Sequence, residues 1–241
     1  MRYGIIILLV FTFSSSSCSA QKDSEENDRS TFTIQLNQDN TFNFFPAVYG
    51  SIPVKKIDLT FYAVYWTTPS FANPDGTGSL IETGVGLGFT KESLYINPTL
   101  GFAHGTFTNA RDSNDQAEPL LADAVVPGLI SFLKNEKWEI EVFCAVYQNL
   151  RKAVSPQSNY LFFWLLPGIR FKSVFATGLH YEQFRDIKNG IGTYTRYGLY
   201  GKVTFKKKYE LRLSGGLNYT PGINDKKIRG EFYKLTVNIP F

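Results

Sequence analysis

The chain ends on the stretch Glu231–Phe241, EFYKLTVNIPF, in which apolar and polar residues alternate from Tyr233 onward. A repeat of two residues is the period of a β-strand that has one apolar face and one polar face. The sequence therefore predicts an amphipathic strand that ends with an aromatic residue. Its apolar members are Tyr233, Leu235, Val237, Ile239 and Phe241.

Segments of the same alternating character recur along the rest of the chain, and together they predict twelve strands. They cover residues 30–37, 41–53, 56–68, 78–90, 93–107, 120–134, 137–151, 159–172, 174–186, 193–206, 209–220 and 229–241. Four segments contain an internal proline, which removes one hydrogen-bond donor from the strand ladder. We expect these strands to bend or bulge at Pro46, Pro98, Pro127 and Pro167.

The connections between the predicted strands alternate between short and long. Short ones fall at residues 53–56, 90–93, 134–137, 172–174 and 206–209. Long polar ones fall at residues 69–77, 108–119, 152–158, 185–192 and 221–229. All the short turns then lie at one end of the sheet and all the long loops at the other. Transmembrane β-barrels sort their connections in this way, with short periplasmic turns and longer external loops.

The aromatic terminal strand, the alternating segments and the unequal connections resemble the outer-membrane β-barrel proteins of Gram-negative bacteria, of the porin type. The resemblance implies an all-β fold, a transmembrane antiparallel up-and-down β-barrel of about 12 strands over residues 30–241. It also implies a place in the cell outer membrane, in contact with its lipids. In that family the terminal strand is the membrane-insertion signal for the barrel-insertion machinery, here Tyr233, Leu235, Val237, Ile239 and Phe241.

The amino-terminal residues 1–20 have the pattern of a secretory signal peptide. Arg2 precedes an apolar stretch, Ile5–Phe13, and the small residues of Ser14–Ala20 suit cleavage after Ala20. Residues 21–29 are polar and acidic, and we interpret them as a flexible periplasmic lead. The alternative is lipid attachment at Cys18, although the serines before it lack the leucine that is usual in a lipidation motif.

Composition excludes several classes of function. The net charge is +4, and the basic residues are scattered among acidic ones, so the sequence gives no sign of nucleic-acid binding. Without the signal peptide only Cys144 remains, which excludes an intramolecular disulfide and a cysteine zinc site. No run of about 18 apolar residues predicts a transmembrane helix. We expect no cofactor and no metal.

Charged side chains share one face of each predicted strand. A soluble core could not hold so many charges, because each costs several kcal/mol to remove from water. A water-filled lumen could hold them while the apolar faces turn to lipid. Glu210 also falls on the charged face of its strand. The predicted pore-lining residues are Asp58, Glu82, Asp123, Glu139, Glu141, Arg170, Lys172, His180, Glu182, Arg196, Lys202, Arg212 and Lys234.

Two interpretations of these charges remain open. Acidic residues dominate the earlier strands and basic residues the later ones, which would set a transverse field across a pore and select small polar solutes. Alternatively, the charges form ion pairs between neighbouring strands. On the predicted registers these pairs are Glu141 with Arg170, Glu139 with Lys172, and Glu182 with Arg196.

Aromatic side chains also point into the predicted lumen, mostly toward its external half. They could form a platform for a sugar or an apolar ligand, or they could fill the bore of a small barrel. They are Tyr62, Trp66, Phe143, Tyr147, Phe162 and Trp164, together with Tyr160.

Two histidines are candidates for proton transfer. His180 shares the lumen face with Glu182, as an acid–base pair would, but two ligands do not make a metal site. His104 is expected on the lipid face near the external rim, with Thr106 on the same face. Some outer-membrane lipid hydrolases and deacylases carry a histidine and a hydroxyl there, so the resemblance allows Thr106 as a nucleophile.

The function expected from the sequence is that of a porin that allows passive diffusion of small polar solutes through a charged lumen, without catalysis. The alternatives are an outer-membrane lipid hydrolase or deacylase with a rim active site at His104, and a closed structural barrel.

Overall fold

The computed structural model describes residues 30–66, 80–105, 120–150, 158–188, 191–206, 208–220 and 228–241. The predicted signal peptide, the periplasmic lead, Cys18 and Thr106 lie outside the described residues. Within the described ranges, no helix is long and apolar enough to cross a bilayer.

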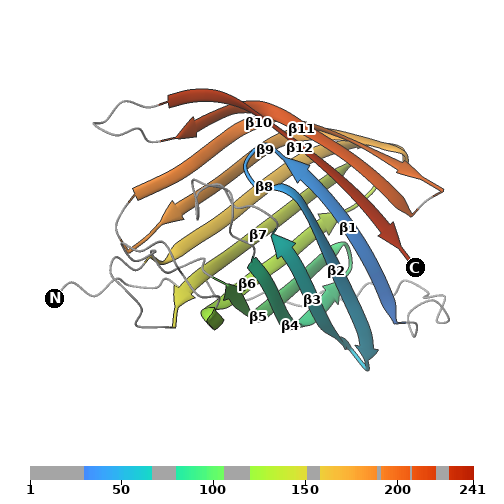
Figure 1. The fold of residues 1–241 in the computed structure, drawn as a ribbon. Helices are drawn as coiled ribbons and strands as arrows, with labels where there is room; N and C mark the ends of the chain where they lie inside the picture. The colour runs from blue at the N-terminus through green and yellow to red at the C-terminus, as the bar shows by residue number, and fades with distance from the viewer. Residues whose placement is uncertain are drawn as a thin grey trace, which may run out of the picture.

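Twelve antiparallel strands close into a single barrel (Figure 1). They are β1 Thr31–Asp39, β2 Asn43–Val54, β3 Ile57–Trp66, β4 Leu80–Lys91, β5 Leu94–Gly105, β6 Leu120–Lys134, β7 Trp138–Asn149, β8 Tyr160–Phe171, β9 Phe175–Asp186, β10 Ile191–Phe205, β11 Tyr209–Thr220 and β12 Ile228–Pro240. Each strand pairs with its neighbours in sequence, so the predicted up-and-down barrel of about 12 strands is confirmed.

The terminal strand closes the barrel. In Figure 1, β1 lies between β2 and β12, which brings the two ends of the strand order together. Thr33 pairs with Pro240, and Asp39 pairs with Lys234. Closure leaves no strand edge with unpaired backbone groups, which is the condition for a sheet that crosses a membrane.

The two ends of the barrel differ, as the connections predict. One end, which we call the turn end, carries the connections at residues 55–56, 92–93, 135–137, 172–174 and 206–208. At this end Lys55, Glu92, Lys172 and Lys206 have positive φ, the left-handed conformation that a tight turn requires. The opposite end, the loop end, carries the connections through residues 67–79, 106–119, 150–159 and 221–227. The β1–β2 connection (residues 40–42) and the β9–β10 connection (residues 187–190) also lie there and are short, so the prediction of a long connection over residues 185–192 was wrong.

Three of the four internal prolines coincide with breaks in the ladder. Pairing between β4 and β5 skips Pro98, pairing between β6 and β7 skips Pro127, and pairing between β8 and β9 skips Pro167. The β2–β3 pairing begins one residue after Pro46. The register is unchanged across these breaks, so the prolines interrupt the ladder without adding a bulge.

The outer face of the barrel is apolar. Leu199 is 64% exposed and Leu213 is 59% exposed, although each lies in the middle of its strand. The same face carries Leu59, Val85, Leu100 and Leu179, all exposed. Aromatic residues stand at its turn end, where Trp138, Phe171, Phe175, Phe205 and Phe241 are exposed. An apolar band with aromatic residues at its rim is the surface that a bilayer covers.

Candidate functional site: the barrel interior

Ion pairs cross the barrel interior near the turn end. Lys202 Nζ of β10 lies 2.7 Å from Glu139 Oε2 of β7, and Arg212 Nη1 of β11 lies 2.6 Å from Glu141 Oε2 of β7. Because β7 is not a neighbour of β10 or β11 in the sheet, these contacts pass through the bore. The acidic and basic walls are therefore joined directly by ion pairs.

A second ionic network fills the middle of the lumen around Glu182. Arg196 Nη1 donates to Glu182 Oε1 at 2.8 Å, and Lys234 Nζ donates to Glu182 Oε2 at 2.8 Å. The hydroxyl of Tyr194 donates to Glu182 Oε1 at 2.8 Å. The side chains of Arg196 and Glu182 have no exposed surface, so no water-filled path runs beside them.

The β1–β2 turn folds into the lumen and joins this network. Arg196 Nη1 lies 3.2 Å from Asp39 Oδ2, and Arg196 Nη2 also donates to the hydroxyl of Thr41. The other carboxylate oxygen of Asp39 accepts the backbone N–H groups of Thr41 and Phe42, at 2.7 and 2.6 Å. Asp39 therefore fixes the conformation of the turn and also anchors it to β10.

Phe42, at the tip of this turn, sits in a cluster of rings. Its ring centroid lies 4.8 Å from that of Trp66, 5.7 Å from that of Phe45, 5.8 Å from that of Phe162 and 6.3 Å from that of Tyr194. Phe42 is only 2% exposed. We call these five rings the aromatic plug, because they come from β2, β3, β8, β10 and the β1–β2 turn and fill the bore between them.

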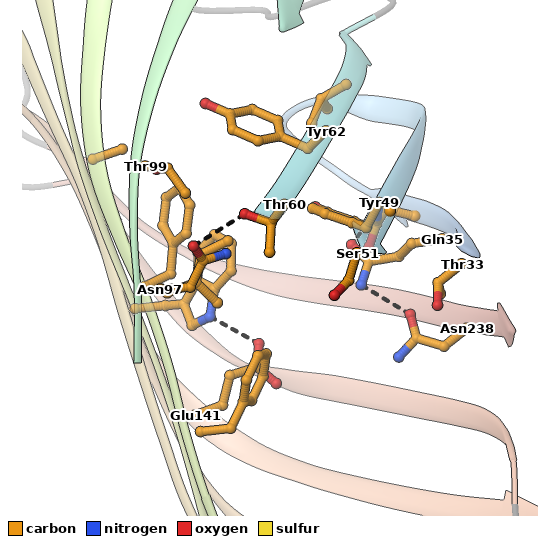
Figure 2. A pocket seen from close by; sticks show the side chains of 18 of the residues that line it. Thr33, Gln35, Tyr49, Ser51, Thr60, Tyr62, Asn97, Thr99, Glu141 and Asn238 are labelled. Atoms are coloured by element: carbon orange, nitrogen blue, oxygen red, sulfur yellow. Dashed lines mark hydrogen bonds between the residues drawn. The ribbon is translucent and has the colours of Figure 1, made fainter. Parts of the chain in front are cut away.

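Below the plug, toward the turn end, the bore widens into a chamber of about 380 Å³ (Figure 2). Its lining reaches Thr31 and Pro240 at the turn end of the barrel. In one wall Thr60 Oγ1 donates to Asn97 Oδ1 at 3.1 Å, and in another Gln35 Nε2 donates to Asn238 Oδ1 at 2.9 Å. A Cβ atom at Gly86 would lie 2.5 Å from Asn97 Oδ1, so the Thr60–Asn97 contact needs glycine at that position.

Most of the charged residues singled out from the sequence lie on inward-facing positions of the strands. Asp58, Glu141, Arg170, Lys202 and Arg212 are partly exposed inside the bore. The side chains of a second group are buried. They are Glu82, Asp123, Glu139, His180, Glu182, Arg196 and Lys234.

Lys172 is the exception, and its assignment to the lumen was wrong. It lies in the β8–β9 turn, with φ of 57°, and its side chain is exposed. β8 ends one residue earlier, at Phe171, so the alternation of the strand does not extend to Lys172.

Of the three predicted neighbouring-strand ion pairs, the structure contains one. Arg196 is directly opposite Glu182 on β10 and β9. The other two pairings were wrong, because the β7–β8 register places Glu139 opposite Gly168 and Glu141 opposite Leu166. Arg170 Nε instead lies 3.7 Å from Glu139 Oε2, and Glu141 pairs with Arg212 across the bore.

The inward aromatic residues divide into two groups. Trp66, Tyr147 and Phe162 are buried, at 7%, 2% and 2% exposed, and they fill the bore. Tyr62, Phe143 and Trp164 are partly exposed and line the chamber, where the last two stack at 4.0 Å between ring centroids. Tyr160 stacks on Phe184 near the loop end. The buried group fills the bore, as one of the two interpretations drawn from the sequence holds, while a ligand platform formed by the partly exposed group stays a prediction.

Asp39, Phe42 and Tyr194 were missed as interior residues. One local signal for the turn was present at Asp39, because an aspartate often accepts backbone N–H groups two or three residues further on. The inward direction of the turn had no such signal, since it depends on Arg196 and on rings from distant strands.

Neither histidine belongs to a group of potential metal ligands among the described residues. His104 lies on the outer face, where Nδ1 accepts the N–H of Ala122 at 3.0 Å and Nε2 lies 3.2 Å from the hydroxyl of Thr83. His180 Nε2 lies 3.4 Å from Glu182 Oε2. No group of three or more potential ligands is arranged for a metal ion within the described ranges.

Known structures share this fold. The KdgM porin matches with a TM-score of 0.50 at 8% identity, over 88% of this chain and 99% of the porin. An outer membrane channel from Pseudomonas putida F1 matches with a TM-score of 0.50 at 12% identity, over 92% of this chain and 100% of the channel. The resemblance to outer-membrane porin barrels is thus confirmed for the fold. No curated protein matches the sequence.

A family model covers the whole chain. It is described as a family of unknown function, DUF6733, and it matches residues 1–241. The chain therefore belongs to the DUF6733 family.

Proposed function

We propose that this protein is an outer-membrane channel for small polar solutes, and that the β1–β2 turn closes its lumen at rest. The observation that carries the proposal is the inward fold of this turn, which places Phe42 among rings from four strands. Residues 40–42 take no part in the strand ladder. The turn can therefore leave the bore without breaking a backbone pair of the barrel wall.

The lining of the bore supports a polar cargo. The chamber and the ionic network around Glu182 together present carboxylates, cations, amides and hydroxyls inside a barrel whose outside is apolar. Such a lining replaces part of the hydration shell of a polar solute during passage. The porin fold of the matching structures supports the same function. With the turn end toward the periplasm, the chamber opens to the periplasm and the plug faces the cell exterior.

Conductance across a planar bilayer tests this proposal. The wild-type protein is expected to be closed for most of the recording, with brief steps of discrete size as the turn leaves the bore. Complete silence, both in the wild type and in variants that weaken the turn, would contradict a channel and favour a closed structural barrel.

The outer face gives a test of the membrane location. Replacing Leu199 by arginine is expected to reduce the folding stability in lipid vesicles by roughly 2–4 kcal/mol, the cost of arginine at the bilayer midplane. Leu199→Ala is the control, because it shortens the side chain without adding charge. A urea titration of the two variants in vesicles measures the difference. Equal stability of the two would mean that Leu199 does not face lipid.

The charged lumen gives a test of selectivity. Lys202→Glu, measured in a Phe42→Ala background to obtain current, is expected to shift the reversal potential in a salt gradient toward cation preference. The change would place a third carboxylate beside those of Glu139 and Glu210. In the wild type, Glu139 Oε2 lies 2.7 Å and Glu210 Oε1 lies 3.9 Å from Lys202 Nζ. Lys206→Glu changes the charge equally in an exposed turn and serves as the control. An identical reversal potential in both variants would show that ions do not pass Lys202.

Hydrolysis at the rim has no comparable support. Both ring nitrogens of His104 already contact protein groups, Ala122 and Thr83. These two contacts connect β4, β5 and the start of β6, so His104 has a structural role.

A further inference from the structure

The chamber below the aromatic plug is a separate feature from the plug itself. Its volume of about 380 Å³ falls in the range of roughly 300–1,000 Å³ that is usual for small-molecule sites. The plug residues Phe45, Trp66 and Phe162 form its inner end, and residues from the turn end of the barrel form its mouth. A solute that enters from the turn end can therefore stay in the chamber while the plug is closed.

One part of the lining consists of aromatic faces. Phe143 and Trp164 stack with ring centroids 4.0 Å apart and planes 14° apart. Tyr49 and Tyr62 stack with centroids 6.4 Å apart and planes 29° apart. All four line the chamber and are only partly buried. Flat aromatic surfaces of this kind suit a ligand with an apolar face.

Another part of the lining consists of polar groups that make no hydrogen bond within the described part of the protein. Among the described residues, the hydroxyls of Ser51 and Tyr49 and the amide nitrogen of Asn97 make no hydrogen bond, and Figure 2 shows these side chains at the chamber. Gln35 and Asn238 lie in the adjoining wall. Polar groups of this kind fix the orientation of a ligand and give specificity.

The carboxylates of the lining are each neutralised or hydrogen-bonded by the protein. Glu141 pairs with Arg212 at 2.6 Å and accepts the indole N–H of Trp164 at 2.9 Å. Glu82 accepts hydrogen bonds from the hydroxyls of Tyr62 and Tyr147, at 2.9 and 2.7 Å. The chamber therefore has hydroxyl and amide groups to offer, and its carboxylates are already engaged.

We propose that the chamber is a binding site for a neutral sugar of one or two rings. Such a ligand combines an apolar ring face, which stacks on aromatic side chains, with hydroxyls that accept and donate hydrogen bonds. Between the strands of the chamber, an acidic or basic sugar would have to displace an existing ion pair such as Glu141–Arg212. The remaining cation of the lining, Lys208, lies in the β10–β11 connection, where its Nζ is 4.9 Å from the ring centroid of Tyr209. This inference deepens the proposed channel function by naming the class of its cargo.

The test is isothermal titration of the purified protein in a detergent without a sugar headgroup. Maltose is the neutral probe, glucuronate the acidic probe and toluene the apolar probe. We expect saturable binding of maltose and at least tenfold weaker binding of glucuronate and toluene. Tyr49→Ala is expected to weaken maltose binding at least tenfold, and Tyr49→Phe to weaken it less, because only the hydroxyl is lost. Tyr197→Ala, on the exposed outer face, is the control and should leave binding unchanged.

Stronger binding of glucuronate or toluene, absence of maltose binding, or equal effects of the Tyr49 and Tyr197 variants would overturn the assignment. The titration needs no ion current, and the bilayer recordings need no sugar. Failure of the sugar site is therefore distinguishable from failure of the channel.

Discussion

Replacing Phe42 by alanine is expected to raise the ratio of open to closed time in a planar bilayer by roughly 10- to 150-fold. Phe42 is 2% exposed in the plug, and burial of a phenylalanine side chain contributes about 1.5–3 kcal/mol relative to leaving it exposed. The variant loses this contribution in the closed state, where the ring is buried, and loses less in the open state, where the turn has left the bore. Single-channel recording gives the ratio directly.

Phe44→Ala is the matched control for this experiment. Phe44 lies two residues further along the chain, but its side chain is 45% exposed and does not belong to the plug. We expect its recordings to resemble those of the wild type. If Phe42→Ala and Phe44→Ala behave alike, the β1–β2 turn does not close the channel.

Replacing Glu182 by alanine is expected to reduce the free energy of unfolding by roughly 3–5 kcal/mol, as for other buried ion pairs that lose one partner. Glu182 accepts hydrogen bonds from Arg196, Lys234 and Tyr194, and its side chain has no exposed surface. The alanine variant leaves two cations buried without their shared carboxylate. Glu182→Gln keeps one acceptor oxygen, so we expect an intermediate loss.

Denaturant unfolding in detergent, followed by tryptophan fluorescence, measures these changes. Gln183→Ala is the control, because residue 183 is the next residue of β9 and lies on its outer face. A stability of Glu182→Ala equal to that of the control would mean that water enters the middle of the lumen and that Glu182 is not buried there.

The fold was predictable because its signals are local. Alternation with a period of two assigns a residue such as Leu213 to one face and Arg212 to the other without any knowledge of the neighbouring strand. The lengths of the connections then sort the turns to one end. The Glu182–Arg196 pair was also predicted correctly, because alternation places both residues on the charged faces of consecutive strands. The connection between these strands, residues 187–190, is shorter than the predicted 185–192, and a short connection restricts the register.

The arrangement of the interior was less predictable, for physical reasons. A long connection joins β7 and β8 and leaves their register open, so the partners of Glu139 and Glu141 could not be assigned. The contacts of these residues with Lys202 and Arg212 cross the bore and depend on the closure of the whole barrel. The inward fold of the β1–β2 turn likewise depends on Arg196, more than 150 positions away in the sequence.

The fold and the channel both require that the charged face of each strand lies inside the barrel while the apolar face contacts lipid. Spin labels introduced one at a time at residues 211 to 214 of β11, in vesicles and in a Cys144→Ser background, test this most directly. We predict high accessibility to oxygen, which concentrates in lipid, for labels at Leu211 and Leu213, and low accessibility for labels at Arg212 and Ser214. The reverse pattern, or equal accessibility at all four positions, would contradict the account.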